Sequence, residues 1–321
     1  MAVLIVDEHE VEQLLDFEGC MQAMEAALTS LARGEVHLPL RPVVRPPGEQ
    51  HFLGLMPVHR GGEAPLYALK TVCVFPDNPM RGLDPHQGSV SLFDGETGQL
   101  RALINAAPVT AIRTAAVSAV ATRALARPDA TVCAIVGAGH QARAHIRAMQ
   151  ALPFERILLA SRTPAAAQTL AEELGAEAED TIEAAVRGAD VVCTTTSSAE
   201  PVLRREWLQP GAHVNAVGAC FPHTRELDTA TVADAAFFVD RRESAENEAG
   251  DYLIPLQEGA IGPGHIRAEL GEVLAGLAPG RAGDEELTVF ESLGLAVEDL
   301  AAAEYIARRA RETGSGTEVE F

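Results

Sequence analysis

The segment AIVGAGHQARAHI, residues 134–146, decides the fold. An apolar run meets three small residues, and an amphipathic segment then begins. This is a G-x-G-x-x-A form of the dinucleotide fingerprint, in which the first glycine permits the turn and the second lets the backbone approach a pyrophosphate. The preceding strand and the following helix are the context that the motif requires, although a strand-to-helix turn that binds nothing is the alternative. The expected cofactor contacts at this turn are those of Gly137, Ala138, Gly139, His140 and Gln141.

Around this turn, apolar segments alternate with helical ones. Helices are predicted at about 109–127, where an alanine-rich stretch ends before Pro128, and at 140–151 and 164–174. Strands that alternate with helices predict a parallel sheet with crossover connections. The apolar segments typical of buried strands lie at residues 131–137, 156–161, 190–196, 213–218 and 236–240.

The first third of the chain has a different pattern. A strand at 2–6 and a helix at about 8–33 lead into the proline-rich segment 38–47, and short strands separated by turn residues follow. A last long helix is predicted at 292–314, with a polar tail after it. We therefore predict an α/β fold in which a Rossmann-type, doubly wound parallel sheet is inserted into a second, α+β domain. The predicted domains are residues 1–115 plus 296–321, which bind substrate, and residues 116–295, which bind the dinucleotide.

The second strand of the predicted sheet ends where the two nicotinamide dinucleotides are distinguished. Enzymes that use NAD carry an acid there for the ribose, whereas a 2′-phosphate needs donors and positive charge. This chain has no acid at that position but has three donors, Ser161, Arg162 and Thr163. The sequence therefore favours NADP(H), with NAD(H) as the alternative. An ordinary surface arginine is the other interpretation of Arg162.

Charge and length exclude several classes of protein. The formal net charge is −21 at pH 7, so we expect neither a nucleic acid nor a membrane partner. No apolar stretch approaches the roughly 20 residues of a transmembrane helix. The start of the chain lacks the basic region of a secretory signal, and the five cysteines form no close pair, so a cytoplasmic location is expected. The ten histidines show no ligand spacing, and no metal site is predicted.

Lys70 is the only lysine in the chain. Its surroundings, LYALKTVCVF at 66–75, have the apolar pattern of a buried strand, where an unpaired lysine is costly. An ammonium group can shift its pKa and exchange a proton, whereas a guanidinium stays charged. We therefore predict that Lys70 is catalytic. The alternative is mutational drift that left one lysine by chance.

Several motifs follow one another along the chain: LKTV at Lys70, AIRTAAVSAVAT at Arg113, VGAGHQA, GAHVNAVGA with RELD close behind, EAGD, and TVFESLGLAVEDLAAA. In these motifs the chain resembles the ornithine cyclodeaminase/mu-crystallin family, and the resemblance covers nearly the whole sequence. It implies a homodimer whose non-Rossmann domain binds substrate and forms the dimer interface. It also implies chemistry at a carbon that bears nitrogen and a carboxylate.

The resemblance implies roles for four polar residues. Arg113 is the first choice for the substrate carboxylate, which a guanidinium binds through two hydrogen bonds, and Arg41 is the second. Lys70 would lie over the reacting centre and exchange a proton, with Asp228 of RELD as its acid/base partner. The alternatives are a surface arginine for Arg41 and a helix N-cap for Asp228.

Further cofactor contacts are expected at the ends of later strands and at the start of the last helix. Each residue could instead serve an ordinary turn or cap. The expected contacts are those of Thr194, Thr195, Asn215, Val217, Gly218, Ser292 and Gly294.

We predict an NAD(P)H-dependent oxidoreductase that reduces the C=N bond of a small, cyclic imino acid such as Δ1-pyrroline-2-carboxylate to an L-amino acid. Family members that cyclise ornithine usually carry a glutamate just before the LMP triplet, and this chain has Gly54 there. Ornithine cyclodeaminase and alanine dehydrogenase-like activities are the enzymatic alternatives. The non-enzymatic alternative is a mu-crystallin-like protein that binds NADP, which the presence of Lys70, Arg113 and Asp228 disfavours.

Overall fold

The computed structural model describes residues 2–320. The chain divides into unit 1, Met1–Arg113 with Leu295–Phe321, and unit 2, Thr114–Gly294. The boundaries expected from the sequence are 115/116 and 295/296. None of the described helices combines the length and the apolar character that crossing a bilayer requires.

Unit 1 is built on a sheet with the strand order β16-β1-β7-β6-β5-β4-β2, in which β3 also pairs with β4. Strands β4 to β7 are antiparallel neighbours, and β1 runs parallel to β7. Buried residues alternate with half-buried ones along β4 and β5, so one face of this sheet packs on the core. The strands are β1 (Ala2–Val6), β2 (Val36–His37), β3 (Val43–Val44), β4 (Phe52–Arg60), β5 (Leu66–Val74), β6 (His86–Asp94), β7 (Leu100–Asn105) and β16 (Thr317–Glu320).

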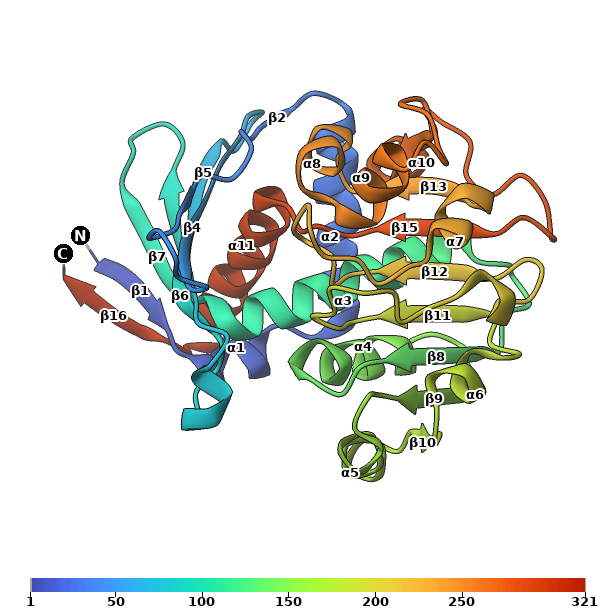
Figure 1. The fold of residues 1–321 in the computed structure, drawn as a ribbon. Coiled ribbons are helices and arrows are strands. Elements are labelled where there is room, and N and C mark those ends of the chain that lie inside the picture. Colours follow the sequence, from blue (N-terminus) through green and yellow to red (C-terminus); the bar gives the residue numbers. More distant parts are fainter. Residues whose placement is uncertain (1, 321) are drawn as a thin grey trace. The chain divides into compact units, whose positions relative to one another are not determined.

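Helix α11 (Ala296–Thr313) contacts β4, β5 and β6 on this buried face, with α2 (Phe17–Ala32) packed against it (Figure 1). The single helix expected at about 8–33 is wrong. The chain forms α1 (Glu8–Leu14) and then α2, because the Asp16 side chain accepts a backbone amide of the next turn and begins a new helix.

The tail after the last helix is polar, as expected, but it is not irregular. It forms β16, which pairs antiparallel with β1 and places the two ends of the chain side by side (Figure 1). All four residues of β16 are exposed, so no apolar pattern marks this strand in the sequence.

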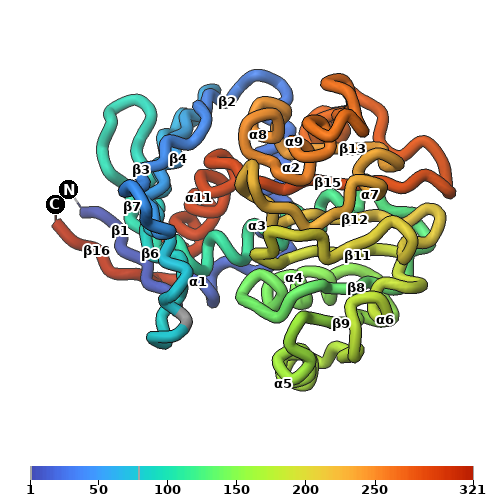
Figure 2. Tube along the Cα trace, in the orientation of Figure 1, coloured from blue at the N-terminus to red at the C-terminus, as the bar shows by residue number. Residues whose placement is uncertain are grey.

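Unit 2 contains a sheet of eight parallel strands: β8 (Val132–Val136), β9 (Arg156–Ala160), β10 (Glu177–Ala178), β11 (Val191–Thr194), β12 (His213–Ala216), β13 (Ala236–Val239), β14 (Ile266–Glu269) and β15 (Thr288–Glu291). Their order is β10-β9-β8-β11-β12-β15-β13-β14. The chain runs from β8 to one edge and returns to β11 on the other side, as the colours in Figure 2 show. This is the doubly wound arrangement of a Rossmann fold, and the switch point between β8 and β11 is where such sheets bind ligands. The predicted fold class is confirmed.

The helices of the parallel sheet alternate with its strands, as the sequence pattern predicted. Helix α3 (Ala106–Leu125) precedes the first strand and carries Arg113. The others are α4 (His140–Gln150), α5 (Pro164–Leu174), α6 (Ile182–Val186), α7 (Thr229–Asp234), α8 (Arg242–Glu248), α9 (Gly250–Gln257) and α10 (Leu270–Leu274). Two 3-10 turns lie at Asn78–Arg81 and Arg205–Trp207.

Candidate functional site

Lys70 lies on the buried face of the unit 1 sheet. Its cross-strand neighbours are Met56 on β4 and Val90 on β6, both of which are apolar and buried. The side chain is 2% exposed, and its Nζ atom lies 2.8 Å from the carboxylate of Asp299 on α11. An amine in an apolar surface is therefore matched by one buried carboxylate.

This environment brings the pKa of the Lys70 amine close to neutral pH. Burial lowers the pKa of Lys70 to about 8; Asp299 opposes the shift, and the positive charges of Arg113 and Arg41 add to it. A group with this pKa can both donate and accept a proton near pH 8. Arg41 is half-buried in the segment between β2 and β3. It is close enough to Lys70 for its positive charge to lower the pKa of the amine.

Arg113 completes a buried cluster of four charges in unit 1. Its Nη1 donates to Oε2 of Glu298 at 2.6 Å, and its Nε donates to Oδ1 of Asp299 at 3.3 Å. The four side chains of Lys70, Asp299, Arg113 and Glu298 are at most 5% exposed. Two cations alternate with two carboxylates, so the cluster has no net formal charge and each ion has a partner.

The two carboxylates of this cluster were not singled out from the sequence. Glu298 and Asp299 lie in the first turn of α11, where the helix dipole favours negative charge. The available signal was an adjacent acid pair inside the TVFESLGLAVEDLAAA motif, flanked by leucine, valine and alanine. Buried acids need cationic partners, and Lys70 and Arg113 were the cations already predicted for the site.

In unit 2, the glycine turn has the geometry that a pyrophosphate needs. Gly137 has φ +124°, and a Cβ there would lie 2.7 Å from Oγ1 of Thr195, so only glycine fits. Gly139 is the N-cap of α4, has no side-chain capping bond, and has open space where a Cβ would be. The start of α4 therefore offers backbone N–H groups and a favourable dipole to an anion. Residues 137–141 fit a dinucleotide pyrophosphate.

The ends of β11 and β12 are tied together by Glu226, which was not singled out from the sequence. Its buried carboxylate accepts the amides of Thr196, at 2.5 Å, and Gly218, at 2.7 Å. Burial raises the pKa of Glu226, and these hydrogen bonds act in the opposite direction. Thr195 donates its Oγ1 proton to the carbonyl of Val136 at 3.0 Å, which joins the end of β11 to β8.

A second carboxylate fixes the loop that follows β15. Oδ2 of Asp240 accepts the amides of Leu293, at 2.7 Å, and Gly294, at 2.8 Å. Gly294 has φ +80°, and the amide of Ser292 donates to the carbonyl of Ala216 at 2.8 Å. The backbone positions expected to contact the nicotinamide end are therefore fixed within unit 2, while the contacts themselves stay predictions.

Asn215 is used inside unit 2. Its Nδ2 donates to Oγ1 of Thr122 at 3.0 Å, and its Oδ1 lies 3.2 Å from Nε2 of His213. The residue is fully buried at the end region of β12. Val217, next but one along the chain, donates its amide to the carbonyl of Thr194 at 3.0 Å. A cofactor contact by Asn215 also stays a prediction.

Asp228 takes the geometry of its structural alternative, a helix N-cap. Its Oδ1 accepts the amide of Thr231 at 2.9 Å and the hydroxyl of the same residue at 2.5 Å, which begins α7. The carboxylate also accepts the amide of Arg205 at 3.2 Å. A catalytic role for Asp228 is a prediction that this capping geometry neither requires nor supports.

The segment after β9 offers hydrogen-bond donors and a cation. Oγ of Ser161 accepts the amide of Thr163 at 3.2 Å and donates to its carbonyl at 2.8 Å, which shapes the turn. Arg162 is exposed and makes no hydrogen bond or ion pair with any residue in the described part of the chain. Its guanidinium is therefore available to an anion.

Comparison with known proteins adds to this geometry. The sequence model of the ornithine cyclodeaminase/mu-crystallin family matches residues 1–314. Mouse ketimine reductase mu-crystallin is 40% identical over 289 residues, which cover 88% of this chain and 89% of the mouse protein. Bacillus cereus Δ1-pyrroline-2-carboxylate reductase is 37% identical over 328 residues, with 99% and 100% coverage.

Solved structures of similar proteins carry nicotinamide cofactors. The Thermococcus litoralis Δ1-pyrroline-2-carboxylate reductase, in complex with NADH and L-proline, has a TM-score of 0.93 at 35% identity and covers 99% of this chain and 100% of its own. An archaeal alanine dehydrogenase dimer with bound NAD has a TM-score of 0.93 at 33% identity, with both chains covered completely. NAD(H) is thus the cofactor present in these similar structures.

Proposed function

Because this chain belongs to the ornithine cyclodeaminase/mu-crystallin family, we propose that it reduces the C=N bond of a small, cyclic imino acid such as Δ1-pyrroline-2-carboxylate. It is an NAD(P)H-dependent oxidoreductase of the imine reductase type. The observation that carries the substrate proposal is the buried Lys70–Asp299 pair, a proton-exchanging group on an apolar surface.

Reduction of a C=N bond requires a hydride at carbon and a proton at nitrogen. The reduced nicotinamide supplies the hydride when it is bound. Lys70, which is protonated below pH 8, holds its proton at the imine nitrogen and transfers it as the new C–H bond forms. Asp299 orients the ammonium group and stabilises its charged form. Arg113 and Arg41 bind the carboxylate and so fix which face of the C=N bond is presented.

Gly54 supports a cyclic substrate over ornithine. It lies on the buried face of β4, two residues from Met56, which pairs with Lys70. A Cβ at Gly54 would be 3.5 Å from the Val72 side chain and 3.8 Å from the Phe52 ring, so β4 has apolar neighbours here and supplies no carboxylate of its own for a distal amine. An imine closed into a ring has no free distal amine to bind.

A substrate panel tests the proposed function. Δ1-Pyrroline-2-carboxylate, Δ1-piperideine-2-carboxylate, pyruvate with ammonia, and L-ornithine would each be supplied with NADPH and with NADH. We expect stoichiometric cofactor oxidation with a cyclic ketimine. Release of proline and ammonia from ornithine without net cofactor change would establish cyclodeamination, turnover of pyruvate with ammonia alone would indicate an alanine dehydrogenase, and binding without turnover would indicate a binding protein.

We propose that NADP(H) is preferred over NAD(H), and Arg162 carries this proposal. Replacing Arg162 by Asp should weaken NADPH binding by about 1.5–3 kcal/mol, roughly 10- to 150-fold, because a charge-assisted bond to the 2′-phosphate is lost. NADH affinity should hold or rise. The measurement is fluorescence titration of both cofactors, with Arg147→Asp on the neighbouring α4 as control. Equal affinities for NADPH and NADH in the unmodified protein would contradict a preference for NADP(H).

The role of Asp228 can be separated from its capping geometry by Asp228→Ser. Serine is a good N-cap and can still accept the Thr231 amide, but it cannot carry a proton as a carboxyl group does. If Asp228 is the acid/base partner, kcat should fall about 10²-fold or more while the melting temperature is kept. An unchanged kcat in Asp228→Ser, together with a lower melting temperature in Asp228→Ala, would show that Asp228 serves only as the N-cap of α7.

We also propose that the chain is a homodimer through the outer face of the unit 1 sheet. On β4 and β5 this face carries half-buried apolar side chains, including Leu55 and Leu69, beside Tyr67, which is 48% exposed. An apolar sheet face of this kind marks an interaction surface, and the similar alanine dehydrogenase is a dimer. Sedimentation equilibrium should give twice the 33.9 kDa chain mass, and Tyr67→Asp should shift it to the monomer. A monomeric wild-type protein would contradict this.

A further inference from the structure

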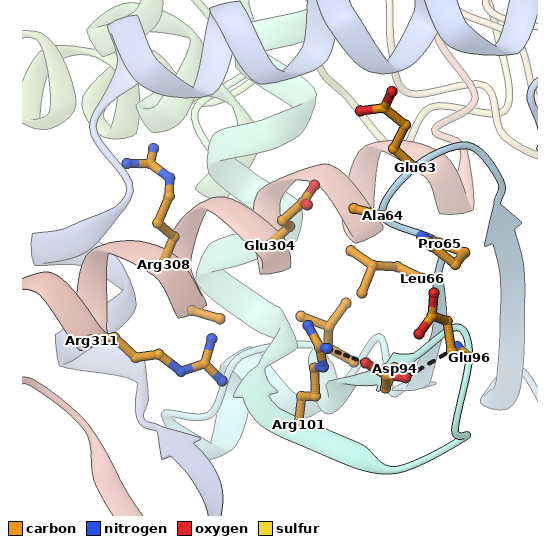
Figure 3. Close-up of a pocket in the computed structure, with 12 residues that line it drawn as sticks. Glu63, Ala64, Pro65, Leu66, Asp94, Glu96, Arg101, Glu304, Arg308 and Arg311 are labelled. Carbon is orange, nitrogen blue, oxygen red and sulfur yellow. Dashed lines mark hydrogen bonds and ion pairs between the residues drawn. The ribbon is translucent and has the colours of Figure 1, made fainter.

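A cavity of about 380 Å³ lies in unit 1 beside the C-terminal half of α11 (Figure 3). Its volume falls within the roughly 300–1,000 Å³ range of small-molecule sites. Apolar groups of Pro65, Leu66, Leu92 and Ala307 form part of its lining, and charged side chains from the β4–β5 loop, the β6–β7 turn and α11 surround them. An apolar surface bordered by charges suits a small amphiphilic molecule.

Several of the charges that line the cavity are satisfied by neighbours. Arg101 forms an ion pair with Asp94 across the β6–β7 turn, drawn as a dashed line in Figure 3. Glu304 accepts Nη2 of Arg60 at 2.9 Å, and Arg308 donates to Glu312 at 2.9 Å. These ion pairs fix the side chains that form the walls of the cavity. The paired groups are therefore less available to a charged ligand.

Three lining charges have no such neighbour. The side chains of Arg311, Glu63 and Glu96 form no hydrogen bond or ion pair with any residue between 2 and 320. Figure 3 shows the guanidinium groups of Arg311 and Arg101 facing the same part of the cavity, with Glu96 on its other side. Glu63 lies at the far end of the view, and its carboxylate points away from these groups. One exposed, unmatched cation, Arg311, and one exposed, unmatched carboxylate, Glu96, therefore border the same apolar floor.

We propose that this cavity is a second binding site, for a zwitterionic amino acid with an apolar side chain. An α-amino acid carries a carboxylate and an ammonium group on one carbon, and its side chain points in a third direction. The carboxylate pairs with Arg311 beside Arg101, the ammonium group pairs with Glu96, and the side chain covers Leu66 and Leu92. A simple anion would meet the unpaired carboxylate of Glu96, and a simple cation would leave Arg311 unmatched.

The cavity is separate from the Lys70 cluster. Both involve α11, but Asp299 is in its first turn and Ala307 lies eight residues later, about 12 Å along the helix axis. The proposal therefore does not depend on the proposed reaction. It concerns the same class of molecule that the proposed reaction would form.

Calorimetric titration with L-leucine tests the site. We expect binding with a dissociation constant of about a millimolar, because Arg311 and Glu96 are exposed and each pairing is worth roughly 1 kcal/mol or less. L-Leucinamide, which lacks the carboxylate, and N-acetyl-L-leucine, which lacks the ammonium group, should each bind about fivefold or more weakly. Equal binding of either analogue, or no binding of leucine, would overturn the proposal.

Variants locate the binding. Arg311→Ala and Glu96→Gln should each weaken leucine binding about three- to tenfold, whereas Arg309→Ala, on the same helix but outside the cavity lining, should leave it unchanged. Lys70→Met should bind leucine as the wild type does. If Lys70→Met abolishes binding while the cavity variants keep it, leucine occupies the catalytic cluster and the proposal is wrong. Loss of catalytic turnover alone, with leucine binding intact, would count only against the proposed reaction.

Discussion

Lys70→Arg is expected to lose about 10²–10⁴-fold in kcat, nearly as much as Lys70→Ala. The variant keeps a positive charge that can pair with Asp299, but a guanidinium cannot give up its proton near neutral pH. Proton-transfer groups contribute to rate by this magnitude. Cofactor affinity, measured by NADPH fluorescence, should be unchanged because the dinucleotide turn lies in unit 2.

The pH dependence of the wild type gives an independent readout of the same residue. Since burial lowers the pKa of Lys70 to about 8, the amine is protonated below pH 8 and neutral above it. Imine reduction uses the protonated form, so kcat/KM should fall as the pH rises through about 8, and amino-acid oxidation should rise over the same interval. The residual activity of Lys70→Arg should show neither the fall in imine reduction nor the rise in amino-acid oxidation around pH 8. Near-normal turnover of Lys70→Arg would remove Lys70 from the proton path.

Arg113→Met should destabilise the protein by about 3–5 kcal/mol, because it takes a guanidinium away from two buried carboxylates, Glu298 and Asp299. Urea denaturation measures the loss. Arg147→Met, exposed on α4, should change stability by no more than about 0.5 kcal/mol. Removing the positive charge of Arg113 should also raise the pKa of Lys70, since that charge now opposes protonation.

A second substitution separates the contribution of Arg113 to stability from its proposed role in substrate binding. Asp299 keeps its ion pair with Lys70 in Arg113→Met, whereas Glu298 loses its hydrogen bond to the guanidinium. Glu298→Gln in the Arg113→Met background removes that buried negative charge and should restore part of the lost stability. It should not restore activity, because the proposed ligand of the substrate carboxylate is still missing. Full activity in Arg113→Met, or an unchanged free energy of unfolding, would contradict the structural role given to the cluster.

The parts of the fold with a local cause could be predicted from the sequence. Position 137 must be glycine because its φ is positive and Thr195 lies against it, so the short glycine motif predicts the turn. The alternation of apolar and amphipathic segments around the turn predicts the strands and helices. The break between α1 and α2 was missed because apolar residues such as Leu14 and Leu15 continue across it, and the N-cap Asp16 looks like any surface acid.

The parts determined by distant partners could not be predicted in this way. Strand β16 forms because β1, from the other end of the chain, offers it an edge. Asp299 meets Lys70 across 229 residues of sequence, so neither position indicates the other by spacing. The single lysine and the motif containing Arg113 were local signals, and they led to two of the four charges in the cluster.

NADPH that carries deuterium at the position of hydride transfer tests the proposed reaction most directly. With Δ1-pyrroline-2-carboxylate, we expect L-proline with one deuterium on its α-carbon, formed in a one-to-one ratio with oxidised cofactor and detected by mass spectrometry and chiral chromatography. Unlabelled proline and ammonia formed from L-ornithine with no net oxidation of NADPH, and no labelled proline from the imine, would contradict it.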